Sequence, residues 1–112
     1  MPALFQLTGG GIGVMPDPAD NPDRHQVPHH DAATRISFQV VNVGDEGGSA
    51  RVGIELDDVF QMEWTSPQLA PGEQAVGMAG LGRLAEGDHE VLAFVNPGSG
   101  VSDHETNRFG VA

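Results

Sequence analysis

The chain has 112 residues, a mass of 11.7 kDa and a formal net charge of −11, with sixteen acidic residues against five basic ones. A chain of this length forms one domain with a modest core. Its negative charge repels phosphate backbones and anionic lipid, so we expect neither a nucleic-acid partner nor a membrane-surface role. The absence of cysteine and lysine excludes thiol catalysis, zinc–thiolate sites, disulfides, P-loops and Schiff-base chemistry.

Sixteen glycines and eight prolines divide the sequence into short runs, which favours strands and turns over long helices. No apolar run reaches the roughly twenty residues that a membrane span needs. The N-terminus has no basic segment followed by an apolar run, so it does not resemble a signal peptide. We therefore expect a cytoplasmic location, or a place in a particle or assembly, unless the chain is excised from a longer secreted protein.

The N-terminal third is the least regular part. Residues 1–15 indicate one or two short strands around the glycine-rich break at 9–11. Residues 16–33 contain four prolines and almost no apolar residues, and they predict a long polar loop laid over one end or edge of the fold. The glycine-rich stretch does not match a phosphate-binding pattern, because position 14 is valine and no helix pattern follows.

From residue 34 onward, apolar and polar residues alternate with the period of two that is typical of half-buried strands. Strands are expected over 34–43, 50–57, 59–64, 73–81, 89–95 and 106–111. The predicted inward-facing residues are Ile36, Phe38, Val40, Ala50, Val52, Ile54, Leu56, Val76 and Met78. In the strand 89–95, Val91, Ala93 and Val95 are expected on one face and Leu92 and Phe94 on the other. About seven strands separated by turns every eight to twelve residues predict an all-β fold, with residues 1–112 forming a single Ig-like antiparallel β-sandwich.

Four motifs, in order, resemble those of the CARDB group of bacterial and archaeal adhesion-related Ig-like domains. They are IxFxVVNxG at 36–44, LAPGE at 69–73, GDHEVLAFVNP at 87–97 and the ending VSDHETNR at 101–108. The resemblance covers residues 34–112 and implies a two-sheet sandwich without catalytic activity, often a spacer or an adhesive module. The chain departs from the family pattern at Asn96, where the family has aspartate, at Asp103 and at Arg108. Residues 1–33 are longer than the corresponding family segment.

Two polar clusters are candidate sites. The loop contains several histidines and aspartates, whose imidazole and carboxylate groups bind metals, but their spacing matches no known metal-binding motif. The candidate ligands, together with Asp17, are Asp20, Asp23, His25, His29, His30 and Asp31. The alternative is a solvated acidic loop, or one that folds onto a partner, and we assign no metal or other cofactor. The second cluster, Asp103 to Glu105 with Asn96 and Asn107, is expected to satisfy unpaired backbone N–H groups at a strand-connecting loop.

The aromatic run around Trp64 offers the candidate contact residues. Phe60, Met62 and Trp64 are predicted to share one face of a strand, either as core residues or as an exposed anchor. No nucleophile pattern is present, so we expect no enzyme activity. The leading hypothesis is a non-catalytic interaction module that docks on a neutral or basic protein partner as an accessory or adhesion-type component, for example a capsid or appendage decoration. The alternative is a module that binds a glycan through Trp64 or a ligand through a metal.

Overall fold

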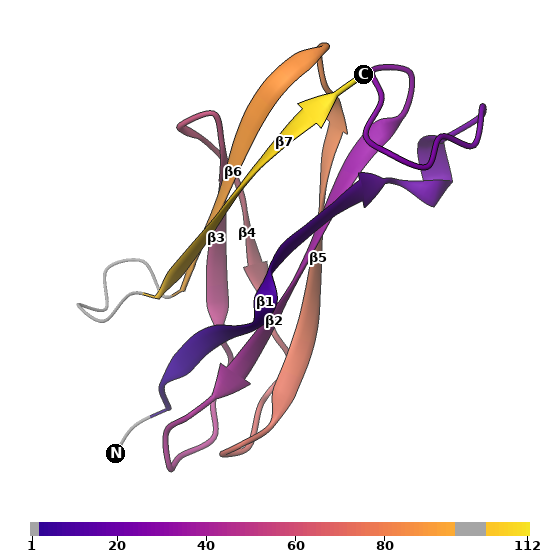
Figure 1. Cartoon of the computed structure of the whole chain (residues 1–112). Coiled ribbons are helices and arrows are strands. Elements are labelled where there is room, and N and C mark those ends of the chain that lie inside the picture. The colour runs from indigo at the N-terminus through magenta and orange to yellow at the C-terminus, as the bar shows by residue number, and fades with distance from the viewer. Residues whose placement is uncertain (1–2, 96–102) are drawn as a thin grey trace.

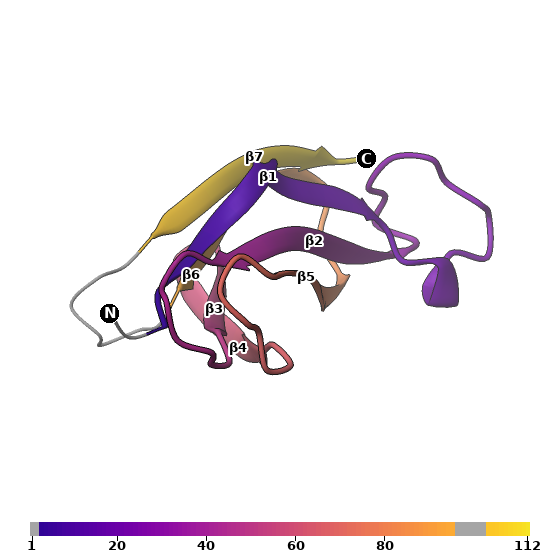
Figure 2. The same cartoon turned by 90° about the horizontal axis from the view of Figure 1, so that it is seen from below.

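The structure, a computed structural model, describes residues 3–95 and 103–112 and contains seven β-strands (Figure 1). The strands are β1 (Phe5–Pro16), β2 (Ala33–Asn42), β3 (Arg51–Leu56), β4 (Val59–Thr65), β5 (Gln74–Arg83), β6 (Gly87–Val95) and β7 (His104–Val111). They form a three-stranded sheet, in the order β1-β2-β5, and a four-stranded sheet, in the order β4-β3-β6-β7. All strand pairs are antiparallel, and Figure 2 shows the two layers facing each other. The predicted all-β sandwich is confirmed.

The core lies between the two sheets, and the alternating residues of the central strands fill it. In β2, every second residue from Thr34 to Asn42 is buried, as the period of two predicts. The predicted inward positions of β3 are confirmed as well, and the predicted alternation in β6 is confirmed, with Val91, Ala93 and Val95 on the inner face. The fully buried apolar side chains include Ile36, Val40, Val52, Ile54, Val91, Ala93 and Val95. Within the described residues, no helix has the length and apolar character needed to cross a bilayer.

The prediction that Val76 and Met78 belong to the core is wrong, since their exposed fractions are 55% and 52%. The inward positions of β5 are taken instead by small residues, among them Gly77 and Ala79. The ring of Phe38 lies against Gly77, where an added Cβ would meet Phe38 Cε2 at 2.3 Å. A large aromatic side chain on β2 therefore fills the space that larger residues on β5 would have occupied.

The prediction that Phe60, Met62 and Trp64 share one face is also wrong. Met62 pairs with Ile54 and Phe60 pairs with Glu55, so one extra residue of β4 lies between these two pairs. Such a β-bulge reverses the alternation, so the side chains just before and just after the extra residue lie on opposite faces of the sheet. Met62 and Trp64 pack against the core, whereas Phe60 is 56% exposed on the outer face.

The glycine-rich break lies inside one long strand. β1 pairs with β2 on both sides of an irregularity between Thr8 and Gly13. Gly11 has a φ of +102°, a conformation that only glycine adopts without strain. The break is therefore a bulge within a twelve-residue strand, and β1 pairs with β2 from residue 5 to residue 8 and again from residue 13 to residue 16.

Side chains from the last strand close one side of the sandwich. Asn107 Nδ2 donates a hydrogen bond to the carbonyl of Ile12 at 2.8 Å, and Leu7 N donates to Asp103 Oδ2 at 2.8 Å. Both bonds join β7, or the residue preceding it, to β1 in the other sheet. The predicted role of accepting from a backbone N–H group is confirmed for Asp103, whereas Asn107 donates to a carbonyl; both partners lie in β1, and Asn96 lies outside the described residues.

The segment between β1 and β2 lies at one end of the sandwich, beside the C-terminus (Figure 1). It begins with a 3₁₀-helix, η1 (Pro18–Asp20). Asp17 caps this helix by accepting a hydrogen bond from Ala19 N at 3.0 Å, and Pro18 starts it with a φ suited to helices. The loop position at one end of the fold agrees with the prediction from the sequence.

Candidate functional site

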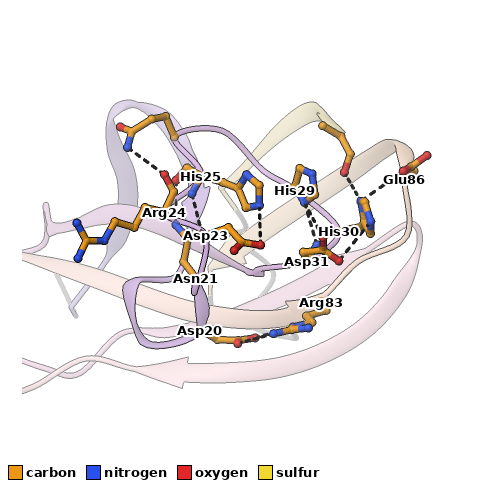
Figure 3. A network of polar contacts seen from close by, with 12 residues as sticks. Asp20, Asn21, Asp23, Arg24, His25, His29, His30, Asp31, Arg83 and Glu86 are labelled. Carbon is orange, nitrogen blue, oxygen red and sulfur yellow. Dashed lines mark hydrogen bonds and ion pairs between the residues drawn. The ribbon is translucent and has the colours of Figure 1, made fainter.

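The loop 17–32, called the His/Asp loop below, is fastened to the sandwich by an ion pair. Arg83, at the end of β5, donates two hydrogen bonds to the carboxylate of Asp20, from Nε at 2.9 Å and from an Nη at 2.8 Å (Figure 3). This two-point geometry is the preferred one for arginine and carboxylate. The hydrogen bonds from Arg83 hold the pKa of Asp20 below its ordinary value. Asp20 is therefore occupied by a structural contact.

A side-chain clamp shapes the next part of the loop. Asn21 Nδ2 donates to the carbonyl of His25 at 2.9 Å, while His25 N donates to Asn21 Oδ1 at 2.8 Å. Arg24 lies within this turn with a φ of +53°. Because both polar groups of the asparagine bind the same residue, the turn from 21 to 25 is closed and the position of His25 is fixed.

The end of the loop is held by the last residue of the chain. His30 N donates to the carbonyl of Ala112 at 2.8 Å, and Ala112 N donates to the carbonyl of Pro28 at 3.0 Å. The His30 ring adds a contact of 2.7 Å from Nδ1 to the same Ala112 oxygen. This bond raises the pKa of His30, and the nearby charges of Asp31 and Glu86 raise it further.

Three imidazole rings stack within this loop. The rings of His25 and His29 are parallel, with centroids 3.7 Å apart, and His29 stacks on His30 at 4.4 Å. His25, His29 and Asp31 each place one ligand atom within 4.8 Å of the other two (Figure 3). Asp31 N also donates to His29 Nδ1 at 3.0 Å, which links the acid and the ring through the backbone.

The structure brings together three of the seven candidate metal ligands. Of the other four, Asp17 caps η1, Asp20 binds Arg83 and His30 contacts Ala112. The fourth, Asp23, has its Oδ2 3.9 Å from His25 Nε2, a distance too long for a hydrogen bond. That His25 nitrogen is buried and has no hydrogen-bond partner among the described residues.

A second feature, absent from the candidates drawn from the sequence, is a hollow of about 620 Å³ beside the β3–β4 turn. We call it the acidic hollow. Its lining residues are Asp57, Asp58, Asp88, His89, Glu90, Arg108, Phe109 and Gly110. Four of the eight are acidic, and Arg108 is paired with Glu90 at 2.7 Å. The acidic turn at 57–58 is the one signal in the sequence that marks this place.

The β3–β4 turn fixes the wall of the acidic hollow. Asp57 and Asp58 have φ values of +51° and +67°, the left-handed pair that is typical of a two-residue hairpin turn of type I′. Asp57 Oδ1 accepts a hydrogen bond from Glu90 N at 2.9 Å, and Asp57 N donates to the Glu90 carbonyl at 2.8 Å. The carboxylate of Asp57 thus holds the turn against β6.

On the outer face of the four-stranded sheet, near the turn that borders the acidic hollow, Phe60 and Leu92 lie in one row with Glu55 between them. Phe60 pairs with Glu55, and Glu55 pairs with Leu92 on the next strand, so these three side chains lie in one row across the sheet. Asp57 and Glu90 are each two residues away from this row along the chain, on the side of the β3–β4 turn. Phe60 is 56% exposed, and Leu92 is half-buried. The row and the acidic hollow together are called the docking face below.

The remaining aromatic candidate lies in the sandwich. Trp64 is half-buried and packs against the core, with its ring edge-on to Phe38 at a centroid distance of 5.3 Å. Such T-shaped pairs stabilise aromatic cores. Met62 is half-buried beside the same core. Of the three candidate contact residues, Phe60 alone has its side chain mostly in solvent.

No protein-family model matches the sequence, and no curated protein matches it either. Among solved structures, the CARDB domain of the PF1109 protein from Pyrococcus furiosus, crystallised in complex with di-metal ions, is similar with a TM-score of 0.69 at 18% identity. The match covers 98% of this chain and 89% of that one.

Parts of two glycosidases are similar as well. A GH2 beta-galacturonidase from Eisenbergiella tayi has a TM-score of 0.67 at 15% identity over 95% of this chain. The b-glucosidase EmGH1 from Erythrobacter marinus has a TM-score of 0.62 at 17% identity over 98% of this chain. The matched regions are 18% and 16% of those chains. At these identities the likeness concerns the fold, and the chain has the CARDB-like, Ig-like β-sandwich fold that its motifs predict.

Proposed function

We propose that the protein is a non-catalytic β-sandwich module that docks on another protein through its docking face, as an accessory or adhesion-type component of a larger assembly. The observation that carries this proposal is the mostly exposed Phe60, two residues after the Asp57–Asp58 turn that borders a hollow lined by four acidic residues. An aromatic anchor next to a charged recess is the arrangement that protein interfaces use for affinity and specificity.

The chemistry of the docking face specifies the partner. The acidic hollow accepts a cationic side chain, arginine or lysine, and the row with Phe60 and Leu92 accepts an adjacent apolar residue. The net charge of −11 adds long-range attraction for a basic surface. The partner is therefore a protein that presents a basic residue beside an aliphatic or aromatic one.

Two further observations support a binding role over catalysis. Asp57 is engaged by the backbone of Glu90, and Glu90 is engaged by Arg108, so these carboxylates are held in structural contacts. Similar sandwiches occur as a small part of larger chains, as in the two glycosidases. The glycan alternative required an exposed Trp64, and the ring instead packs on Phe38 in the sandwich.

Position-specific photo-crosslinking in the source cells tests the proposal. A photoreactive phenylalanine analogue replaces Phe60 in one protein and Val76 in a control, because Val76 is equally exposed on the other sheet. We expect a crosslink to one protein from position 60 and none from position 76. Equal crosslinking at both positions, crosslinks only between copies of this chain, or no crosslink from position 60 would contradict the proposal.

Substitutions then measure the contribution of each part with the crosslinked partner. Burying a phenylalanine contributes about 1.5–3 kcal/mol, so Phe60→Ser is expected to weaken binding by roughly 10- to 100-fold. Asp88→Asn removes a charge from the acidic hollow and is expected to slow association at low salt. Val76→Ser is the matched control and should leave both quantities unchanged.

A further inference from the structure

We infer that His25, His29 and Asp31 form a binding site for one divalent transition-metal ion, with Zn²⁺ as the test ion. The site uses none of the residues of the docking face, so its success or failure is independent of the proposed function. The argument rests on the donor set, on a buried nitrogen that has no hydrogen-bond partner among the described residues, and on the way the His/Asp loop is held.

The donor set selects the class of ion. Two imidazole nitrogens and one carboxylate suit Zn²⁺, Ni²⁺ or Cu²⁺, whereas Ca²⁺ and Mg²⁺ prefer sites made of oxygen ligands alone. The three ligand atoms already lie within 4.8 Å of one another. Three protein ligands leave the fourth position of a tetrahedral ion open to water or to a donor from another molecule.

The side chain of His25 supplies the second observation. Its Nε2 is buried and makes no hydrogen bond with the residues that the structure describes. A buried polar atom without a hydrogen-bond partner destabilises the fold, because it has lost its bonds to water and gained none in return. A bound ion would satisfy this nitrogen, and Asp23 Oδ2 at 3.9 Å adds negative charge beside it.

The loop is arranged in advance of binding. Asp20 is fixed by Arg83, the backbone around His25 is fixed by Asn21, and the segment around His30 is fixed by Ala112. These contacts hold the backbone of the cluster in place in the absence of an ion. Little chain entropy is therefore lost when a metal binds, in contrast to a loop that must fold around the ion.

Binding nevertheless requires one ring to turn. An imidazole binds a metal in the plane of its ring, and the planes of His25 and His29 are parallel, 6° apart, with centroids separated by 3.7 Å. Ligand atoms around a tetrahedral Zn²⁺ lie about 3.4 Å apart, so the group also contracts. The expected structural change is loss of the His25–His29 stack, which NMR can detect.

Titration of untagged, EDTA-treated protein with ZnCl₂ tests the site. We expect one ion per chain by calorimetry and native mass spectrometry, and a higher melting temperature with Zn²⁺ but not with Ca²⁺ or Mg²⁺, because an ion that binds the native state stabilises it. Long-range ¹H–¹⁵N spectra should show the largest shifts at His25 and His29. No uptake, or equal stabilisation by Ca²⁺, would overturn the inference.

Four variants locate the ion. His25→Gln and His29→Gln are expected to weaken Zn²⁺ binding at least tenfold, and Asp31→Asn, which keeps the shape of the side chain, should weaken it as well. His104→Gln is the matched control, because His104 is an exposed histidine on β7. Thermal melting in EDTA verifies that each variant folds. If a histidine variant does not fold, the Zn²⁺ affinity of Asp31→Asn decides whether the site is assigned correctly. Equal loss of binding in His104→Gln, or full binding by Asp31→Asn, would contradict the assignment.

Discussion

The imidazole of His89 joins the carboxylate of Asp57 to a backbone carbonyl. Nδ1 lies 2.7 Å from Asp57 Oδ2, and Nε2 lies 2.8 Å from the oxygen of Ala85. Both partners accept hydrogen bonds, so the ring donates from both nitrogens only as an imidazolium. The Ala85 carbonyl and then Asp57 raise the pKa of His89, while the bond from His89 lowers the pKa of Asp57.

These shifts predict a dependence of stability on pH. His89 has a higher pKa folded than unfolded, so its contribution is complete below about pH 6.5 and is lost as the pH rises through the folded value. The contribution of Asp57, whose pKa is lowered, is present above about pH 4 and lost as the pH falls through its folded value. We expect the β3–β4 turn to be most stable between these limits, measured by thermal unfolding from pH 4 to pH 9.

The variant His89→Gln separates this pair from the other titrating groups. The difference in melting temperature between wild type and variant should be largest near pH 5.5 and should shrink toward pH 8.5. A difference that stays constant with pH would show that His89 contributes through packing alone. Thr106→Ala, an exposed change on β7, serves as a variant without an expected pH effect.

Adding a methyl group to β5 tests the packing of the aromatic core. In Gly77→Ala the new Cβ would meet the buried ring of Phe38 at 2.3 Å, and Phe38 contacts Trp64. We expect a loss of about 1–3 kcal/mol in the free energy of unfolding and a shift in tryptophan fluorescence. Gly80→Ala on the same strand has no atom within 4 Å of the new Cβ and should change neither measurement.

Removing the link between β7 and β1 should loosen one side of the sandwich. Asn107→Ala leaves the carbonyl of Ile12 without its hydrogen bond from Nδ2, and the expected loss in the free energy of unfolding is about 1–2 kcal/mol. Hydrogen exchange at β1 amides should become faster than at β3 amides. Unchanged exchange at β1 would contradict a bridging role, and Asn107→Asp would show whether the donor is the group required.

Added NaCl should stabilise the fold. With a net charge of −11, the excess acidic side chains repel one another, and exposed ion pairs such as Arg51–Glu63 offset little of that repulsion. Screening from about 0.01 M to about 0.5 M salt shortens the range of this repulsion from about 30 Å to under 10 Å. We expect a rising melting temperature in calorimetry, and a steady fall would contradict the prediction.

The strands are predictable because burial enforces a period of two on residues such as Ile36, Phe38 and Val40. The errors have local causes. Val76 and Met78 point outward because Phe38, distant in sequence, fills the space inside β5. Phe60 points outward because of one extra residue in β4, and a bulge leaves the hydrophobic pattern ambiguous.

For the candidate sites, the sequence predicts which types of residue are available but not which of them lie close together. The histidines and acids of the loop are visible in the sequence, but their proximity depends on the side-chain clamp of Asn21 and on the left-handed φ of Arg24. No sequence pattern indicates either the hydrogen bonds of Asn21 or the left-handed conformation of Arg24. The acidic hollow forms because the turn at 57–58 meets the ends of β6 and β7, a contact between segments that are more than thirty residues apart in sequence.

The unequal edges of the sandwich have a consequence for behaviour at high concentration. One side is closed by Asp103 and Asn107, whereas β4 and β5 each have an edge without a partner strand among the described residues. An open edge is a template for strand addition from another copy of the chain. The large negative charge keeps copies apart at neutral pH, and near the isoelectric point of about 4.5 that protection disappears. Acidic conditions therefore favour edge-to-edge assembly at β5, where Val76 and Met78 lie exposed.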